Sequence, residues 1–147
     1  MHVNFLRTGV GVESVSHLHD IQSTYRQLKQ SGQTCAFLTT RRTPTRANDM
    51  VNGGSVYWII KRQICARQEI IDVQTLEDDE GKAYCRIVMS PAIMLTSPLS
   101  HRHIQGWRYL TPEKAPQDLR PFDPTDKNNN VEIDPKMAEE LAELGLL

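Results

Sequence analysis

The chain has 147 residues, of which 39% are hydrophobic, and a formal net charge of −1. This length suits one domain with its own core, and the hydrophobic content argues against wholesale disorder. The apolar runs are all far shorter than the roughly 18 residues that cross a bilayer. The first residues also lack the features of a secretion signal. We therefore expect a cytoplasmic protein that makes no membrane contact.

Charge is distributed unevenly along the chain. Residues 1–110 contain 13 lysines and arginines against 9 acidic residues, a net charge of +4. Residues 111–147 contain 4 basic against 9 acidic residues, a net charge of −5. A mildly basic body is weaker evidence than the footprint of a dedicated DNA-binding protein, but it allows a local anion-binding face.

The three cysteines, Cys35, Cys65 and Cys85, have no C-x-x-C spacing that would indicate zinc or redox chemistry. If residues 78–81 form a hairpin turn, Cys85 faces a residue near Gln74, nine positions from Cys65. That is roughly 30 Å along a strand, whereas a disulfide needs Cα atoms within about 7 Å. We predict free thiols.

The first forty residues predict a strand, a helix and a second strand. Residues 2–8 alternate as a short strand with Val3, Phe5 and Arg7 on one side. A helix then begins at Ser14 or Ser16 and runs to about residue 31, where Gly32 would end it. Its apolar residues recur at three- and four-residue intervals. Residues 34–40 are rich in β-branched and aromatic side chains and predict the second strand.

The middle of the chain predicts three extended segments. A polar, arginine-rich connection and one short helical turn to Val51 lead to a glycine turn and strands at 55–61, 63–76 and 82–90. Residues 77–82 form the turn between the last two. Alternation fails where Ile70 and Ile71 are adjacent, so we expect a β-bulge near residues 68–69.

The remainder predicts little regular structure before the C-terminus. Residues 91–120 are proline-punctuated and read as irregular. We assign residues 1–120 to a single α+β domain and residues 121–147 to an acidic linker with a short C-terminal helix, capped by Asp134. The fold class is α+β: a small, curled, mostly antiparallel sheet or pseudo-barrel with one main helix.

Two stretches carry a family resemblance. They are GGSVYWIIK, beginning at Gly53, and QGWRYLTP, beginning at Gln105. Together they resemble a bacterial family of proteins of about this length, classed as a domain of unknown function. The resemblance covers residues 1 to about 120 and implies no activity.

A remoter, pattern-level similarity is to PUA-like folds, especially the ASCH domains. These are small β-barrels in which a polar Thr/Arg segment, a glycine turn into a strand and a long strand follow one another. Residues 39–46, 53–60 and 64–73 follow that order. The similarity implies binding of RNA or a modified nucleotide, and occasionally hydrolysis.

Basic and aromatic side chains form the main candidate site. Guanidinium groups bind phosphate in a bidentate manner, and aromatic rings stack on bases, as in single-stranded RNA recognition. We predict an RNA or nucleotide site without a cofactor or metal, whose ligand-binding residues are Arg41, Arg42, Arg46, Lys61, Arg67, Trp107, Arg108 and Tyr109. The alternative is a solvated basic rim with both rings packed in the core.

Other functions stay open. A small-metabolite hydrolase would use Glu69 or His103 as its base, although the sequence assigns no catalytic residue. A partner-binding protein would use the helix at 134–147. Residues 9–14 lie between a strand and a helix, as a phosphate-binding turn would, but they lack a third glycine and carry Glu13. They favour a structural turn.

Overall fold

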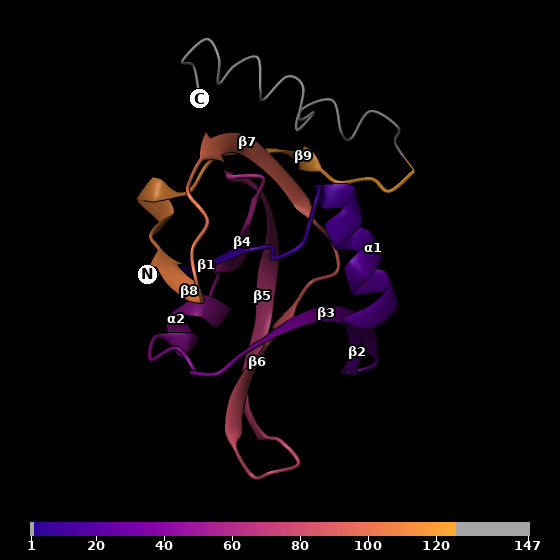
Figure 1. Cartoon of the computed structure of the whole chain (residues 1–147), viewed down its shortest axis with the longest axis vertical. Coiled ribbons are helices and arrows are strands. Elements are labelled where there is room, and N and C mark those ends of the chain that lie inside the picture. Colours follow the sequence, from indigo (N-terminus) through magenta and orange to yellow (C-terminus); the bar gives the residue numbers. More distant parts are fainter. Residues whose placement is uncertain (1, 126–147) are drawn as a thin grey trace.

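The computed structural model describes residues 2–125 (Figure 1). In these residues nine strands, two α-helices and one 3₁₀ helix follow one another. The elements are β1 (Asn4–Thr8), α1 (Val15–Tyr25), β2 (Gln27–Gln30), β3 (Gln33–Thr40), α2 (Ala47–Val51), β4 (Ser55–Ile60), β5 (Gln63–Glu77), β6 (Ala83–Met89), β7 (Met94–Ser100), β8 (Trp107–Leu110), η1 (Pro112–Lys114) and β9 (Asp118–Pro121). The tail helix expected at 134–147 lies outside the described residues.

The strands form one mixed, mostly antiparallel sheet, which confirms the α+β class. Its main path runs β2-β3-β6-β5-β4-β1-β8, and β7 and β9 branch from β5. Of the strand pairs, β1 with β4 is parallel. The expected curled sheet or pseudo-barrel is wrong, because the sheet is not strongly curled, and β2 and β8 end the path on opposite sides without pairing with each other. The sheet is open.

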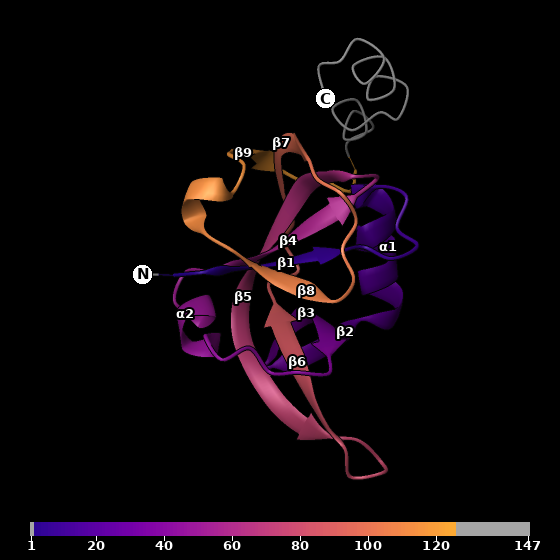
Figure 2. The ribbon, with the colours of Figure 1, turned by 60° about the vertical axis from the view of Figure 1, so that its left-hand side comes forward.

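Strand β5 is the centre of the sheet. Its first half pairs with β4 on one edge and β7 on the other, and its second half pairs with β6 in a hairpin that extends away from the body (Figures 1 and 2). The bulge expected near residues 68–69 lies slightly later, where the register shifts between Ile70 and Asp72. The shift resolves the adjacent isoleucines, because Ile70 is buried and Ile71 is exposed.

Apolar side chains cover both faces of the sheet. The larger cluster lies beneath α1 and includes Phe5, Trp58 and Ile87. The smaller one, around Ile59 and Leu110, lies on the opposite face. All six residues of β4 are buried, as expected for a strand with a core on each side.

A buried polar contact fastens α1 to the sheet. The side-chain amides of Gln22 and Gln68 exchange two hydrogen bonds of 2.8 Å, and the indole N–H of Trp58 donates to the Gln68 oxygen at 2.9 Å. Gln68 also donates to the carbonyl of Ser90. Because these buried amides are bonded to one another, the helix is held in one position over the strands.

The predicted helix over residues 14–31 is too long. Ser14 caps α1 as expected, accepting from the amide of His17, but the helix ends at Tyr25. Residues 27–30 are instead strand β2. Ser31 and Gly32 both have positive φ, at 52° and 80°, which makes a two-residue hairpin turn into β3. Gly32 therefore ends a strand and not a helix.

The irregular segment expected over residues 91–120 is also wrong, because it contains β7, β8 and β9. Strand β7 lies between β5 and β9, and β8 adds to the edge of β1. These strands are stabilised by partners distant in sequence, so their local composition gave no signal.

Two further sequence predictions concern the cysteines and membrane-spanning segments. Cys35, Cys65 and Cys85 are buried free thiols, and burial raises the pKa of Cys65 to about 12. None of the helices within residues 2–125 has the length and apolar character needed to cross a membrane.

Candidate functional site

The two aromatic residues of the predicted site lie on the edge strand β8. Register pairs Trp107 with Arg7 and Tyr109 with Phe5, so both rings face the side of the sheet that carries α1. The Trp107 ring stacks on Phe5, with centroids 5.0 Å apart, and meets the Tyr109 ring edge-on at 4.9 Å. Trp107 is half-buried and Tyr109 is 37% exposed. Neither ring is sealed in the core.

The arginine-rich connection between β3 and α2 is attached to this edge by Tyr109. The amide of Arg46 donates to the Tyr109 hydroxyl at 3.2 Å, and the Thr45 hydroxyl lies at the same distance. The Arg46 guanidinium lies 5.9 Å from the centre of the Tyr109 ring, within cation–π range. Segments 63 residues apart are therefore held together.

Between these two segments is a hollow of about 410 Å³, which we call the Trp107 hollow. Its lining consists of Thr40, Arg41, Arg42, Gln105, Gly106, Trp107, Arg108 and Tyr109. Five of the eight predicted ligand-binding residues thus converge, and Arg46 adjoins them through Tyr109.

The arginines of the Trp107 hollow differ in how their charge is compensated. Arg41 lies 3.6 Å from Asp78, and Arg46 forms an ion pair of 3.0 Å with Asp49. Arg108 donates to the carbonyls of Gln105 and Trp107, which holds it against its own turn. Arg42 is exposed, and no carboxylate of residues 2–125 lies within ion-pair distance of it.

Lys61 and Arg67 do not reach the Trp107 hollow. Lys61, in the β4–β5 turn, pairs with Glu13 at 2.6 Å, and this contact lowers the pKa of Glu13. Arg67 binds Asp118 through two hydrogen bonds of 2.7 Å and donates to the Ser55 hydroxyl at 3.1 Å. The hydrogen bond that Arg67 donates to Asp118 raises the pKa of Arg67, and the same contact lowers the pKa of Asp118.

The residues expected to act as a hydrolytic base are also placed elsewhere. Glu69 is exposed on β5 and His103 is exposed on the connection before β8, and neither lines the hollow. No group of three histidine, cysteine, aspartate or glutamate side chains within the described part of the chain is arranged to hold a metal ion.

Sequence reasoning missed a second pocket beside the first, with Arg7, Arg26 and Trp58 in its lining. Arg7 left a detectable signal, because it is a charged residue on the same side of a strand as Val3 and Phe5, both of which are buried. Arg26 left none, since its position depends on where α1 ends.

A family model described as protein of unknown function (DUF1489) matches residues 5–147. The chain belongs to the DUF1489 family. The match confirms the resemblance carried by the two motifs, and it extends through the tail, beyond the limit of about residue 120 that the motifs indicated. No curated protein and no solved structure matches the DUF1489 chain.

Proposed function

We propose that this DUF1489 protein binds RNA or a nucleotide at the Trp107 hollow. One observation carries the proposal: residues 40–42 and 105–109, far apart in sequence, line one concavity that combines guanidinium groups with aromatic rings. Its volume of about 410 Å³ falls within the range of small-ligand sites, so it suits one nucleotide unit.

The residues have distinct roles in this proposal. Arg42 meets the phosphate, because no carboxylate of residues 2–125 already neutralises it. Trp107 and Tyr109 present ring surface to the base, and stacking of this kind contributes about 1–3 kcal/mol per base. Arg41 and Arg46 are exposed, and a phosphate would compete with Asp78 and Asp49 for them.

Fluorescence anisotropy with a labelled pool of single-stranded RNA tests the proposal. Arg42→Glu should weaken binding at least about tenfold, because it replaces a charge-assisted bond with repulsion. Arg46→Glu should have a smaller effect. For a short single strand, the logarithm of the affinity should fall with log salt by about 0.7 for each phosphate contacted.

The matched control is Arg62→Glu, which makes the same charge change in the β4–β5 turn, outside the hollow. It should leave binding unchanged. Repeating the titration with a mononucleotide separates the two ligand sizes. Absence of binding to both ligands, or equal loss in the Arg42 and Arg62 variants, would refute the proposal.

A further inference from the structure

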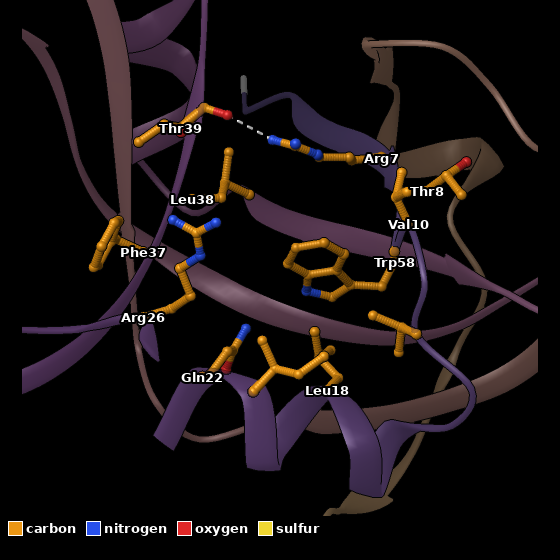
Figure 3. Close-up of a pocket in the computed structure, with 13 residues that line it drawn as sticks. Arg7, Thr8, Val10, Leu18, Gln22, Arg26, Phe37, Leu38, Thr39 and Trp58 are labelled. Carbon is orange, nitrogen blue, oxygen red and sulfur yellow. Dashed lines mark hydrogen bonds between the residues drawn. The ribbon is translucent and has the colours of Figure 1, made fainter. Parts of the chain in front are cut away.

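A second pocket lies under the same face of the sheet, between β1, β3, β4 and the end of α1 (Figure 3). Its volume is about 230 Å³, the space of about eight water molecules at the density of the liquid. The Trp58 ring lies in its interior, with Gln22 and Leu18 entering from α1 (Figure 3). We call it the Arg7–Arg26 pocket.

Strand register explains why Arg7 is there. Arg7 pairs with Trp58 of β4 on one side and with Trp107 of β8 on the other. The three side chains therefore form one row across three adjacent strands, on the face covered by α1. The Arg7 side chain, at the centre of this row, is half-buried.

The guanidinium of Arg7 is only partly satisfied. One of its nitrogens donates to the carbonyl of Thr39 at 2.8 Å (Figure 3). Within residues 2–125 that carbonyl is the one acceptor it bonds, so most of its five N–H donors stay available to a ligand.

Arg26 supplies a second positive charge to the same space. It directly follows α1, and its guanidinium points into the pocket beside Phe37, 5.9 Å from the ring centre (Figure 3). No carboxylate of residues 2–125 lies within ion-pair distance of Arg7 or Arg26, and the pocket lining contains no acidic residue. Burial, and then the charge of Arg26, lower the pKa of Arg7.

Two like charges beside one cavity repel each other in the empty protein, and solvent screens the half-buried guanidinium of Arg7 less than it would screen an exposed one. An anion entering the pocket would meet both. The lining also contains apolar side chains, which are Val12, Leu18, Ile21 and Leu38, together with the Trp58 ring. A ligand with a charged head and a short apolar body would match both kinds of surface.

We propose that the Arg7–Arg26 pocket binds a small organic anion, whose phosphate or carboxylate group contacts the two arginines and whose apolar body packs against Trp58. The site is distinct from the Trp107 hollow and does not depend on RNA or nucleotide binding there. Gly9 and Val10, from the glycine turn that follows β1, also line this pocket.

The test is a titration of the full chain with phenyl phosphate and with benzoate, followed by calorimetry. Inorganic phosphate and benzyl alcohol serve as the separate head and body. The aromatic anions should bind more tightly than either part, and the better of the two assigns the head group. Trp58 fluorescence should respond in a Trp107→Phe background, which places the ligand in this pocket.

Arg26→Gln should weaken binding of the aromatic anion about tenfold or more, because it removes a charge-assisted contact. Arg26 is exposed, so this variant should fold. Arg7→Gln should have at least as large an effect, provided that circular dichroism shows the native fold. Arg62→Gln, in the β4–β5 turn and in the lining of neither site, is the matched control and should leave the affinity unchanged.

Three results would overturn the inference. They are absence of binding by any anion at millimolar concentration, equal affinity in wild type and Arg26→Gln, or benzyl alcohol binding as tightly as phenyl phosphate. Two variants distinguish the two proposals. Arg42→Glu tests RNA binding at the Trp107 hollow, and Arg26→Gln tests anion binding in the Arg7–Arg26 pocket.

Discussion

The Trp107 hollow and the Arg7–Arg26 pocket adjoin each other, because the consecutive residues Thr39 and Thr40 lie in their linings. The two sites differ in how the charges of their arginines are compensated. At the hollow, Arg41 and the adjoining Arg46 have carboxylate neighbours, and Arg42, which has none among residues 2–125, is exposed to solvent. In the pocket, no carboxylate of residues 2–125 lies within ion-pair distance of Arg7 or Arg26, and Arg7 is half-buried. An uncompensated charge in a confined space is the stronger indication of a missing anion, because solvent screens it less.

Substituting the two tryptophans, one in each region, should give the largest difference in stability. Trp58 is 5% exposed and donates to Gln68, so Trp58→Ala should lower the free energy of unfolding by about 3–5 kcal/mol. Trp107 is half-buried at an edge strand, and Trp107→Ala should cost clearly less. Denaturant unfolding measures both. Equal losses would mean that Trp107 belongs to the core and does not line an open surface.

The amide pair behind Trp58 should give the next largest effect. Gln68→Met leaves the Gln22 amide and the Trp58 N–H without partners in a buried region, which should cost about 1–3 kcal/mol. Gln27→Met, at an exposed position of β2, is the control and should be close to neutral. A neutral Gln68→Met would show that water replaces the lost bonds.

A smaller loss of stability is expected when the ion pair between Arg67 and Asp118 is broken. The hydrogen bonds from Arg67 hold the pKa of Asp118 below its ordinary value, so this carboxylate stabilises the fold above pH about 4. The contribution is lost as pH falls through the lower, folded-state pKa. The pair is partly exposed, so we expect it to contribute no more than about 1 kcal/mol.

Asp118→Asn should therefore reduce stability at neutral pH and flatten the acid side of the profile of stability against pH. Thermal unfolding between neutral and acid pH measures it. Asp123→Asn offers a comparison, because hydrogen bonds from Thr125 lower the pKa of Asp123 in the same direction. An unchanged acid limb in Asp118→Asn would contradict the assignment.

The smallest predicted changes in stability have opposite signs in the two regions. Without ligand, Arg26→Gln should raise stability by a few tenths of a kcal/mol at low salt, since it relieves repulsion with Arg7. Arg46→Gln should lower it by a similar amount through the lost Asp49 pair. Added salt should shrink both differences. If both variants shift stability in the same direction, the two regions do not differ in charge compensation.

Local pattern predicted much of the sheet. Strands β4, β5 and β6 and the turn between β5 and β6 match the sequence expectation to within one or two residues, because alternation and turn residues act over a few positions. The turn has its own local cause: the Asp78 carboxylate accepts from the amides of Glu80 and Lys82.

The strands over residues 94–121 could not be predicted in this way. Strand β8 has four residues and β9 has four, and each exists because it completes the edge of a distant strand. The same limit applies to the pseudo-barrel. An open or a closed sheet can have the same alternation, and only the pairing of the edge strands distinguishes them.

The candidate site was likewise predicted only in part from local sequence. Residue types on the β3–α2 connection and on β8 indicated arginines and aromatic rings that could meet, and in the structure they do. Arg67 was assigned to that group, but its partner is Asp118, 51 residues away. Nothing near Arg67 in the sequence distinguishes a paired guanidinium from an available one.

By itself, the sequence determined the α+β class, the central strands, the free thiols and membership of the family, because each depends on short-range patterns or on motifs. Only the tertiary structure decided which positively charged side chains lie beside a carboxylate and which lie near another positive charge. Coulomb interactions depend on distance in space, and folding brings Arg7 to Arg26, and Arg67 to Asp118, from segments that are separate along the chain.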